Sequence, residues 1–148
     1  MRSDYLERNS GVSDTKKKIR HVNAAITLTA EDSGSVFLIN QAAAYAITLP
    51  ECATEDNKLM GWNAEFIIDT ANTNAVTVQV TDDDGDIMHG HGIDGEDGAA
   101  QTVSEGTGFD VVTFISGATK GDRASIICDG DSYYVLSHAA DKAHITFS

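Results

Sequence analysis

The sequence predicts an all-β fold, an antiparallel β-sandwich or barrel of about ten short strands, preceded by an extended N-terminal arm. Its 148 residues, 41% of them hydrophobic, suit one domain with one core. From residue 23 onward, short runs of β-branched or aromatic residues recur at intervals of about ten residues, separated by Gly, Asp, Asn or Ser. We therefore divide the chain into a basic arm, residues 1–22, and a β-domain, residues 23–148.

The arm differs from the rest of the chain in charge. Residues 1–20 contain six Lys or Arg and three acids, whereas the remainder contains four Lys or Arg and twenty acids. The arm has few apolar side chains and no regular period, so it cannot bury a face of its own. Such a segment is either a solvated tail or a strap that becomes ordered on an acidic partner. The candidate binding residues are Arg2, Arg8, Lys16, Lys17, Lys18 and Arg20.

Ten segments of the β-domain have the composition of strands, and they are residues 25–29, 36–40, 46–49, 64–69, 75–80, 101–104, 110–115, 124–128, 133–137 and 145–147. The clearest prediction is a β-hairpin at Asp129-Gly130, where glycine supplies the positive φ of a tight turn. Residues 41–45 are Ala-rich but too few to form a stable helix. Pro50 ends the strand before it.

Residues 81–108 interrupt the regular spacing of strands. They include seven acids between Asp82 and Asp97, five glycines between Gly85 and Gly98, and no basic residue. We expect a long, mobile surface loop, because this composition cannot pack a core.

Two groups within this region could in principle bind a metal. Asp82, Asp84 and Asp86 have the spacing of the first calcium ligands in an EF-hand, but Ile87 and Ile93 occupy the positions that require Gly and Glu. A solvated acidic turn is therefore the preferred interpretation. His89 and His91, with Asp94 nearby, could supply zinc ligands.

The histidine pair is also a weak candidate. Gly90 and Gly92 flank the histidines, and we expect the backbone there not to be held in a strand. We predict no metal site and no cofactor, and calcium or histidine-bound metal stays open as an alternative.

Other classes of function are disfavoured by composition. The sequence has no recognisable signature of a nucleophilic enzyme, so we predict no catalytic residues. A net charge of −13 disfavours direct nucleic-acid binding. No signal peptide and no apolar run of about 18 residues is found, which predicts no membrane contact. Cys52 and Cys128 form neither a C-x-x-C pair nor a framework, which favours synthesis and assembly in a reducing cytoplasm.

Several short motifs resemble small structural proteins of tailed-bacteriophage virions. These motifs are Ala25-Ile-Thr-Leu-Thr-Ala-Glu-Asp-Ser-Gly-Ser-Val-Phe-Leu-Ile39, Ala46-Ile-Thr-Leu-Pro50, Gly61-Trp-Asn-Ala-Glu-Phe-Ile-Ile68, Gly121-Asp122, Cys128-Asp-Gly-Asp-Ser-Tyr-Tyr-Val135 and Ile145-Thr-Phe-Ser148. The resemblance covers most of residues 25–148. The arm and the acidic region 82–98 fall outside it.

The resemblance to capsid decoration, or cement, proteins implies a non-enzymatic homotrimer on the outside of the phage head. There it would bind the major capsid protein and tie neighbouring capsid subunits together. The expected location is the capsid exterior of the virion, after assembly in the host cytoplasm. The alternatives are a head-fibre or tail-spike module that binds a host receptor or glycan through residues 81–108, and a calcium-dependent cell-surface domain.

Overall fold

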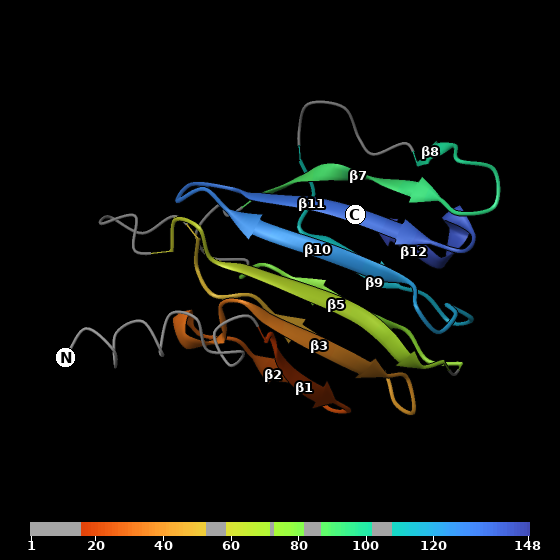
Figure 1. The fold of residues 1–148 in the computed structure, drawn as a ribbon, viewed down its shortest axis with the longest axis horizontal. Coiled ribbons are helices and arrows are strands. Elements are labelled where there is room, and N and C mark those ends of the chain that lie inside the picture. Colours follow the sequence, from red (N-terminus) through yellow and green to blue (C-terminus); the bar gives the residue numbers. More distant parts are fainter. Residues whose placement is uncertain (1–15, 53–58, 72, 82–86, 102–107) are drawn as a thin grey trace, which may run out of the picture.

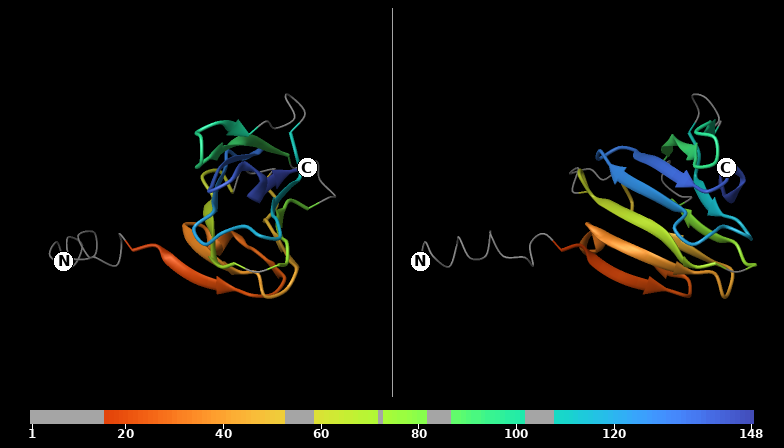
Figure 2. Two further views of the ribbon diagram at one scale, coloured as in Figure 1. Left: turned by 90° about the vertical axis from the view of Figure 1, so that its right-hand side faces the viewer. Right: turned by 45° about the vertical axis from the view of Figure 1, so that its right-hand side comes forward.

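The computed structural model, which describes residues 16–52, 59–71, 73–81, 87–101 and 108–148, is a sandwich of two β-sheets (Figures 1 and 2). The predicted all-β sandwich of short strands is thus confirmed. The elements are β1 Lys18–Val22, β2 Ile26–Thr27, the 3₁₀ turn η1 Ala30–Asp32, β3 Ser35–Asn40, β4 Tyr45–Thr48, β5 Asn63–Thr70, β6 Val76–Gln79, β7 Met88–Asp94, β8 Ala100–Gln101, β9 Val111–Phe114, β10 Arg123–Cys128, β11 Tyr133–Ala139, the 3₁₀ turn η2 Lys142–His144 and β12 Ile145–Phe147.

Both sheets are mixed, so the expectation of a purely antiparallel fold is wrong. The larger sheet has the order β1-β3-β5-β10-β11-β7-β8 and the smaller has the order β12-β9-β6-β4-β2. From β1 to β6, consecutive strands alternate between the two sheets. Strands that neighbour each other within a sheet are therefore joined by a crossover through the other sheet and run parallel, as β1, β3 and β5 do. Antiparallel pairing dominates only in the second half of the chain.

The core lies between the sheets and follows the alternation of each strand. In β10 and β11, every second residue is buried and the residues between are exposed. Phe37 of β3 stacks on Phe66 of β5 at 5.2 Å, and Trp62 meets Tyr133 edge-on at 5.9 Å. The indole N–H of Trp62 donates to the carbonyl of Thr29, so its polar atom is satisfied inside the core.

The last residues of the predicted arm belong to the sandwich. β1 is an edge strand that pairs in parallel with β3, and Val22 reaches the core. Arg20 pairs with Asp32 and its guanidinium lies 5.5 Å from the centre of the Phe37 ring. Basic side chains are well suited to an edge strand, because they discourage further strand addition. The expectation that the arm extends to residue 22 is therefore wrong from residue 18 onward.

Part of the predicted acidic loop is also a strand. β7 pairs in parallel with β11, and β8 pairs antiparallel with β7. A Cβ on Gly90 would lie 1.8 Å from the carbonyl oxygen of Val135, so only glycine allows this approach of the two strands. The expected long loop is thus wrong over residues 88–94, whereas Asp82, Asp84 and Asp86 lie outside the described residues.

The cysteines correct a second expectation. Cys52, in the segment that follows β4, forms a disulfide with Cys128 at the end of β10, across 76 positions of sequence. The two cysteines therefore do form a framework, which spacing alone did not reveal. The bond joins a segment leaving the smaller sheet to a strand of the larger one.

The predicted hairpin is confirmed. β10 and β11 pair antiparallel around residues 129–132, and Gly130 has a φ of 101°. The connection has four residues, closed by Asp129, whose carboxylate accepts the backbone N–H groups of Asp131 and Ser132. In the described part of the chain, no helix is long and apolar enough to cross a membrane.

Candidate functional site: the outer face of the larger sheet

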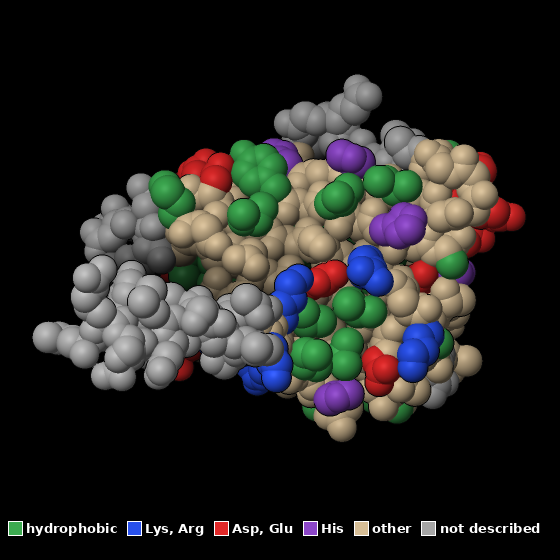
Figure 3. All heavy atoms as spheres, in the orientation of Figure 1, with side chains coloured by type: hydrophobic (Ala, Val, Ile, Leu, Met, Phe, Trp, Pro, Cys, Tyr) green, Lys and Arg blue, Asp and Glu red, His purple; other side chains and the backbone are tan. Residues whose placement is uncertain are grey.

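The side of the larger sheet that points away from the core, called the outer face below, is the surface seen in Figures 1 and 3. Strand registers arrange its side chains in three rows that run across the sheet. These rows are Asn63-Ile127-Tyr134-His89, then Ile19-Val36-Glu65-Ser125-Leu136-His91, then His21-Leu38-Ile67-Arg123-His138-Ile93. The face is therefore an ordered surface built from six neighbouring strands.

Exposed hydrophobic side chains concentrate on the outer face. Of the six large hydrophobic residues that are exposed in the described part of the chain, all but Met60 lie on it. Ile127, Tyr134 and Leu136 are each 47–49% exposed and are neighbours on β10 and β11. Figure 3 shows hydrophobic side chains over both the β1–β5 side and the β10–β7 side of the face. Exposed apolar side chains that gather on one face, with polar residues between them, are typical of a protein-contact surface.

The ionised groups of the outer face are paired within the chain. Glu65 contacts Lys17 at 3.1 Å and Arg123 at 3.4 Å. Asp69 contacts Lys120 at 3.3 Å and His21 at 3.9 Å. Two carboxylates and three Lys or Arg lie on the face, and Asp129 and Asp131 of the hairpin turn lie at its end near Tyr134, whereas the whole chain has 23 acids and 10 Lys or Arg. The face is a nearly neutral surface on a strongly acidic protein.

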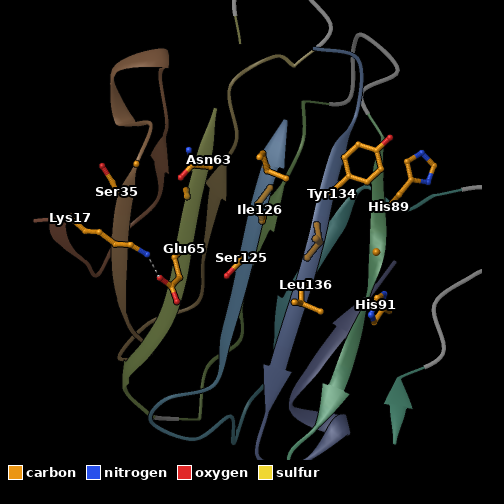
Figure 4. A pocket seen from close by; sticks show the side chains of 15 residues that line it. Lys17, Ser35, Asn63, Glu65, His89, His91, Ser125, Ile126, Tyr134 and Leu136 are labelled. Atoms are coloured by element: carbon orange, nitrogen blue, oxygen red, sulfur yellow. Dashed lines mark hydrogen bonds and ion pairs between the residues drawn. The ribbon is translucent and has the colours of Figure 1, made fainter. Parts of the chain in front are cut away.

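Histidine is the other residue type that gathers here. Four of the five histidines of the chain lie on the outer face, at residues 21, 89, 91 and 138. His89 and His91 are two residues apart on β7 and point to the same side, as Figure 4 shows.

A groove of about 540 Å³ crosses the outer face (Figure 4). Tyr134, Leu136 and the two histidines of β7 lie at one side, and the Lys17–Glu65 ion pair lies at the other. Ser125 and the backbone of β10 and β11 form its floor. The groove is open and mostly apolar, which suits a protein side chain or the apolar face of a ligand.

Tyr134 lies beside the acidic hairpin turn at the edge of this groove. The neighbouring Asp129, first as a hydrogen-bond partner and then through its charge, raises the pKa of the phenol above its ordinary value. Asp129 in turn has a lowered pKa, because the backbone N–H groups of Ser132 and Asp131 stabilise its charged form. The ring of His89 lies 6.1 Å from the Tyr134 ring. The exposed tyrosine of the outer face is therefore next to a negatively charged turn.

The structure separates the six basic residues predicted as a binding arm. Arg2 and Arg8 lie outside the described residues. Lys17 borders the groove, while Lys18 reaches the backbone carbonyl of Glu31 at 3.4 Å. The side chain of Arg20 is used to hold the edge strand, as described above. Lys16 is exposed. Among the described members, Lys17 contributes to the outer face.

The histidine-based metal hypothesis fails on geometry. His89 and His91 face outward, but Asp94 is buried on the other side of the strand and accepts the N–H of Glu96. The prediction that the backbone there is not a strand was also wrong. Within the described ranges, no group of three or more His, Cys, Asp or Glu residues is placed to hold a metal ion.

A buried carboxylate–imidazole pair lies away from the outer face. His144 Nδ1 is 2.8 Å from Asp122 Oδ2, and Asp122 is 3% exposed. Asp122 also accepts the N–H groups of Thr119 and Ala140 and the hydroxyl of Thr119. These bonds connect the turn before β10, the end of β11 and η2, so the pair fastens three segments of the fold.

The sequence analysis missed the apolar residues of the outer face, although a signal existed. The runs Ile126-Ile127 and Tyr133-Tyr134-Val135-Leu136 place apolar side chains at consecutive positions, hence on both sides of their strands. A solvated face would instead alternate with polar residues, so these runs indicate strands that are covered on both sides.

Comparison with known proteins adds no relationship: no family model matches the chain, and no curated protein matches its sequence.

Proposed function

We propose that this chain is a non-enzymatic structural protein of a tailed-phage virion that decorates the outer surface of the capsid as a homotrimer. In this role it binds the major capsid protein and stabilises contacts between neighbouring capsid subunits. The observation that carries the proposal is the outer face, an ordered and nearly neutral surface with exposed Ile, Leu and Tyr side chains. Such a surface suits protein–protein contact.

Three further features support a virion role. The motifs of residues 25–148 resemble phage structural proteins, as described above. The net charge of −13 opposes aggregation of particles that display many copies. A disulfide persists in oxidising surroundings, which a released particle meets. Assembly in the host cytoplasm then involves the thiol form, and the bond closes after release.

The test is reconstitution on phage heads that lack this protein. The full chain and a form without residues 1–15 are mixed with purified heads, and bound protein is measured by sedimentation at low and moderate salt. We expect the full chain to bind heads and to raise their resistance to heat. The shorter form retains β1 and should remain folded. It loses Arg2 and Arg8 together with three acids and keeps Lys16, Lys17, Lys18 and Arg20, so its net charge changes by only one unit. Its binding should be weaker if residues 1–15 contact the capsid directly.

Binding to tails in place of heads would contradict decoration. Equal binding of the two forms at low salt would remove residues 1–15 from the proposal and leave residues 16–148 as the capsid-binding part. Cryo-electron microscopy of the complex would then show which capsid subunits the domain contacts.

A receptor- or glycan-binding module of a fibre or spike is the second candidate. The groove favours it, because an exposed tyrosine beside serine, asparagine and histidine side chains can stack on a sugar and bond its hydroxyls. A Tyr134→Ala variant that loses binding to host cells, while the intact chain does not bind heads, would select this alternative.

A further inference from the structure

We propose that copies of this chain bind one another through the outer face of the larger sheet, as the contact that builds the proposed trimer. The stoichiometry rests on the proposed function, whereas the surface rests on the observations that follow.

The first observation is the composition of the face. Ile127, Tyr134 and Leu136 leave about half of each side chain in water, although β10 and β11 already bury their other sides in the core. Covering such side chains removes apolar area from water, which is the main favourable contribution to association.

The second observation identifies the occupant as another copy. Two chains with a net charge of −13 repel one another over most orientations. The outer face avoids this repulsion, because Glu65 and Asp69 are neutralised by Lys17, Arg123 and Lys120 of the same chain. Unlike the uncharged side of the smaller sheet, it also exposes large apolar side chains. Contact through this surface places the acidic remainder of each copy away from the interface. A self-association surface on this protein therefore requires the low charge that the outer face has.

The third observation is size. Six strands spaced ~4.8 Å apart, with about six residues each at ~3.3 Å per residue, span roughly 600 Å² in projection. In a three-fold ring each copy uses this face for two contacts, so each contact covers roughly 300 Å² per partner in projection, below the ~800 Å² of accessible surface that a partner contributes to an interface of standard size. We therefore expect a reversible association whose extent depends on protein concentration.

The two halves of the face also differ, as a closed ring requires. A three-fold ring brings two different patches of each copy together, whereas a two-fold dimer uses one patch twice. The β1–β3–β5 half contains the ion pairs of Glu65 and Asp69, and the β10–β11–β7 half contains Tyr134 and most of the histidines. We infer that the first half of one copy meets the second half of the next.

The test is the mass of the assembly in solution, measured by light scattering during gel filtration. The double variant Ile127→Glu/Leu136→Glu adds two charges to exposed positions of the outer face. The matched control Thr146→Glu adds one charge to an exposed position on the outer side of the smaller sheet. A milder variant, Leu136→Ser, tests the same contact with less disturbance of the strand. Circular dichroism and thermal unfolding verify that each variant is folded.

We expect the intact chain and Thr146→Glu to have about three times the 15.7 kDa mass, and the double variant to have the mass of one copy. Leu136→Ser should raise the dissociation constant at least tenfold. A dimer that the double variant dissociates would support the surface and contradict the trimer. A folded double variant with the mass of the intact protein would overturn the proposal, as would an intact chain that is monomeric up to millimolar concentration.

Mixing the same variants with phage heads separates this inference from the proposed function. A monomeric double variant that still binds heads supports both the surface and the decoration role. An intact monomer whose head binding is lost in the double variant shows that the face contacts the capsid, which overturns self-association and retains decoration. An intact trimer that binds no heads leaves the surface standing and contradicts decoration.

Discussion

The two sheets of the sandwich share one core but present different surfaces to solvent. On the smaller sheet, the outward rows are Thr27-Thr48-Gln79-Val111 and Ala46-Thr77-Thr113-Thr146. On the larger sheet, the corresponding positions hold isoleucine, leucine, tyrosine and histidine. Both sets favour β-structure, but threonine adds a hydroxyl that water can satisfy. Strand propensity therefore does not explain the apolar residues of the larger sheet, and the proposed contact between copies would.

The comparison also shows where charge lies on this protein. The outward rows of the smaller sheet contain no ionisable residue, so that side is polar and neutral. The outer face of the larger sheet combines apolar residues with ion pairs that close within the chain. Most of the acidic excess is thus outside the flat surfaces of both sheets. Acidic turns such as residues 94–97 and 129–131 contribute to it at the ends of strands.

The largest effect on stability should come from the disulfide, which joins the segment after β4 of the smaller sheet to the end of β10 in the larger sheet. Closing a loop of 76 residues restricts the unfolded chain by about 4 kcal/mol on an entropy basis. We expect Cys52→Ser/Cys128→Ser to lower the free energy of unfolding by about this amount, as measured by guanidinium denaturation. The intact chain with a reductant provides the control and should lose a similar amount. Equal stability of the oxidised and reduced chains would show that the bond does not contribute.

A smaller effect, confined to one half of the outer face, is expected from Gly90→Ala. Its Cβ would meet the Val135 carbonyl at 1.8 Å, and a backbone group cannot move aside without displacing β7 from β11. We expect the free energy of unfolding, measured by urea denaturation, to fall by about 1–3 kcal/mol, and the amides of β7 to exchange hydrogen faster. The amides of the smaller sheet should keep their protection from hydrogen exchange.

Gly117→Ala is the matched control for this substitution. Gly117 also has a positive φ, 96°, but a Cβ there meets no atom within 4 Å. The control therefore includes the backbone strain, about 1 kcal/mol, without the clash. If both variants lost the same free energy and β7 stayed protected, the close approach of β7 and β11 would not depend on glycine.

The contrast between the two halves of the outer face also shows what sequence can reveal. The hairpin of β10 and β11 was predictable, because two runs of β-branched and aromatic residues on either side of a turn glycine are local signals. β7 was not, since its glycines and flanking acids are typical of a loop, and the reason for Gly90 is a contact with Val135, 45 positions away. β1 was missed because Arg20 pairs with Asp32 and Lys18 donates to the backbone carbonyl of Glu31, two contacts that no local pattern specifies.

The same distinction applies to the candidate site. The chemistry of single residues pointed to Lys17 and to the histidine pair, and both border the groove. Their assembly into one surface depends on the order of the strands, which places β7 beside β11 and β1 beside β3. The disulfide was hidden for the same reason, because only the crossover between sheets brings Cys52 to Cys128.

The smallest expected effect concerns Tyr134, the aromatic residue that distinguishes the outer face from the threonine face. Asp129 raises the pKa of Tyr134, first through a hydrogen bond and then through its charge, and backbone N–H groups lower the pKa of Asp129 itself. Because the pKa of Asp129 is lowered, its charged carboxylate stabilises the fold at pH values above 3.8, the ordinary pKa of Asp. This contribution disappears as the pH falls through the lowered pKa.

Asp129→Asn keeps an oxygen for the turn but removes the charge. We expect the Tyr134 phenol of this variant, followed by NMR of its ring carbons, to ionise at lower pH than in the intact chain, and the acid-induced loss of stability to diminish. Asp131→Asn is the control, since Asp131 makes the last and least of the contributions to the Tyr134 shift. Identical titrations of Tyr134 in the intact chain and Asp129→Asn would show that Asp129 does not act on this phenol.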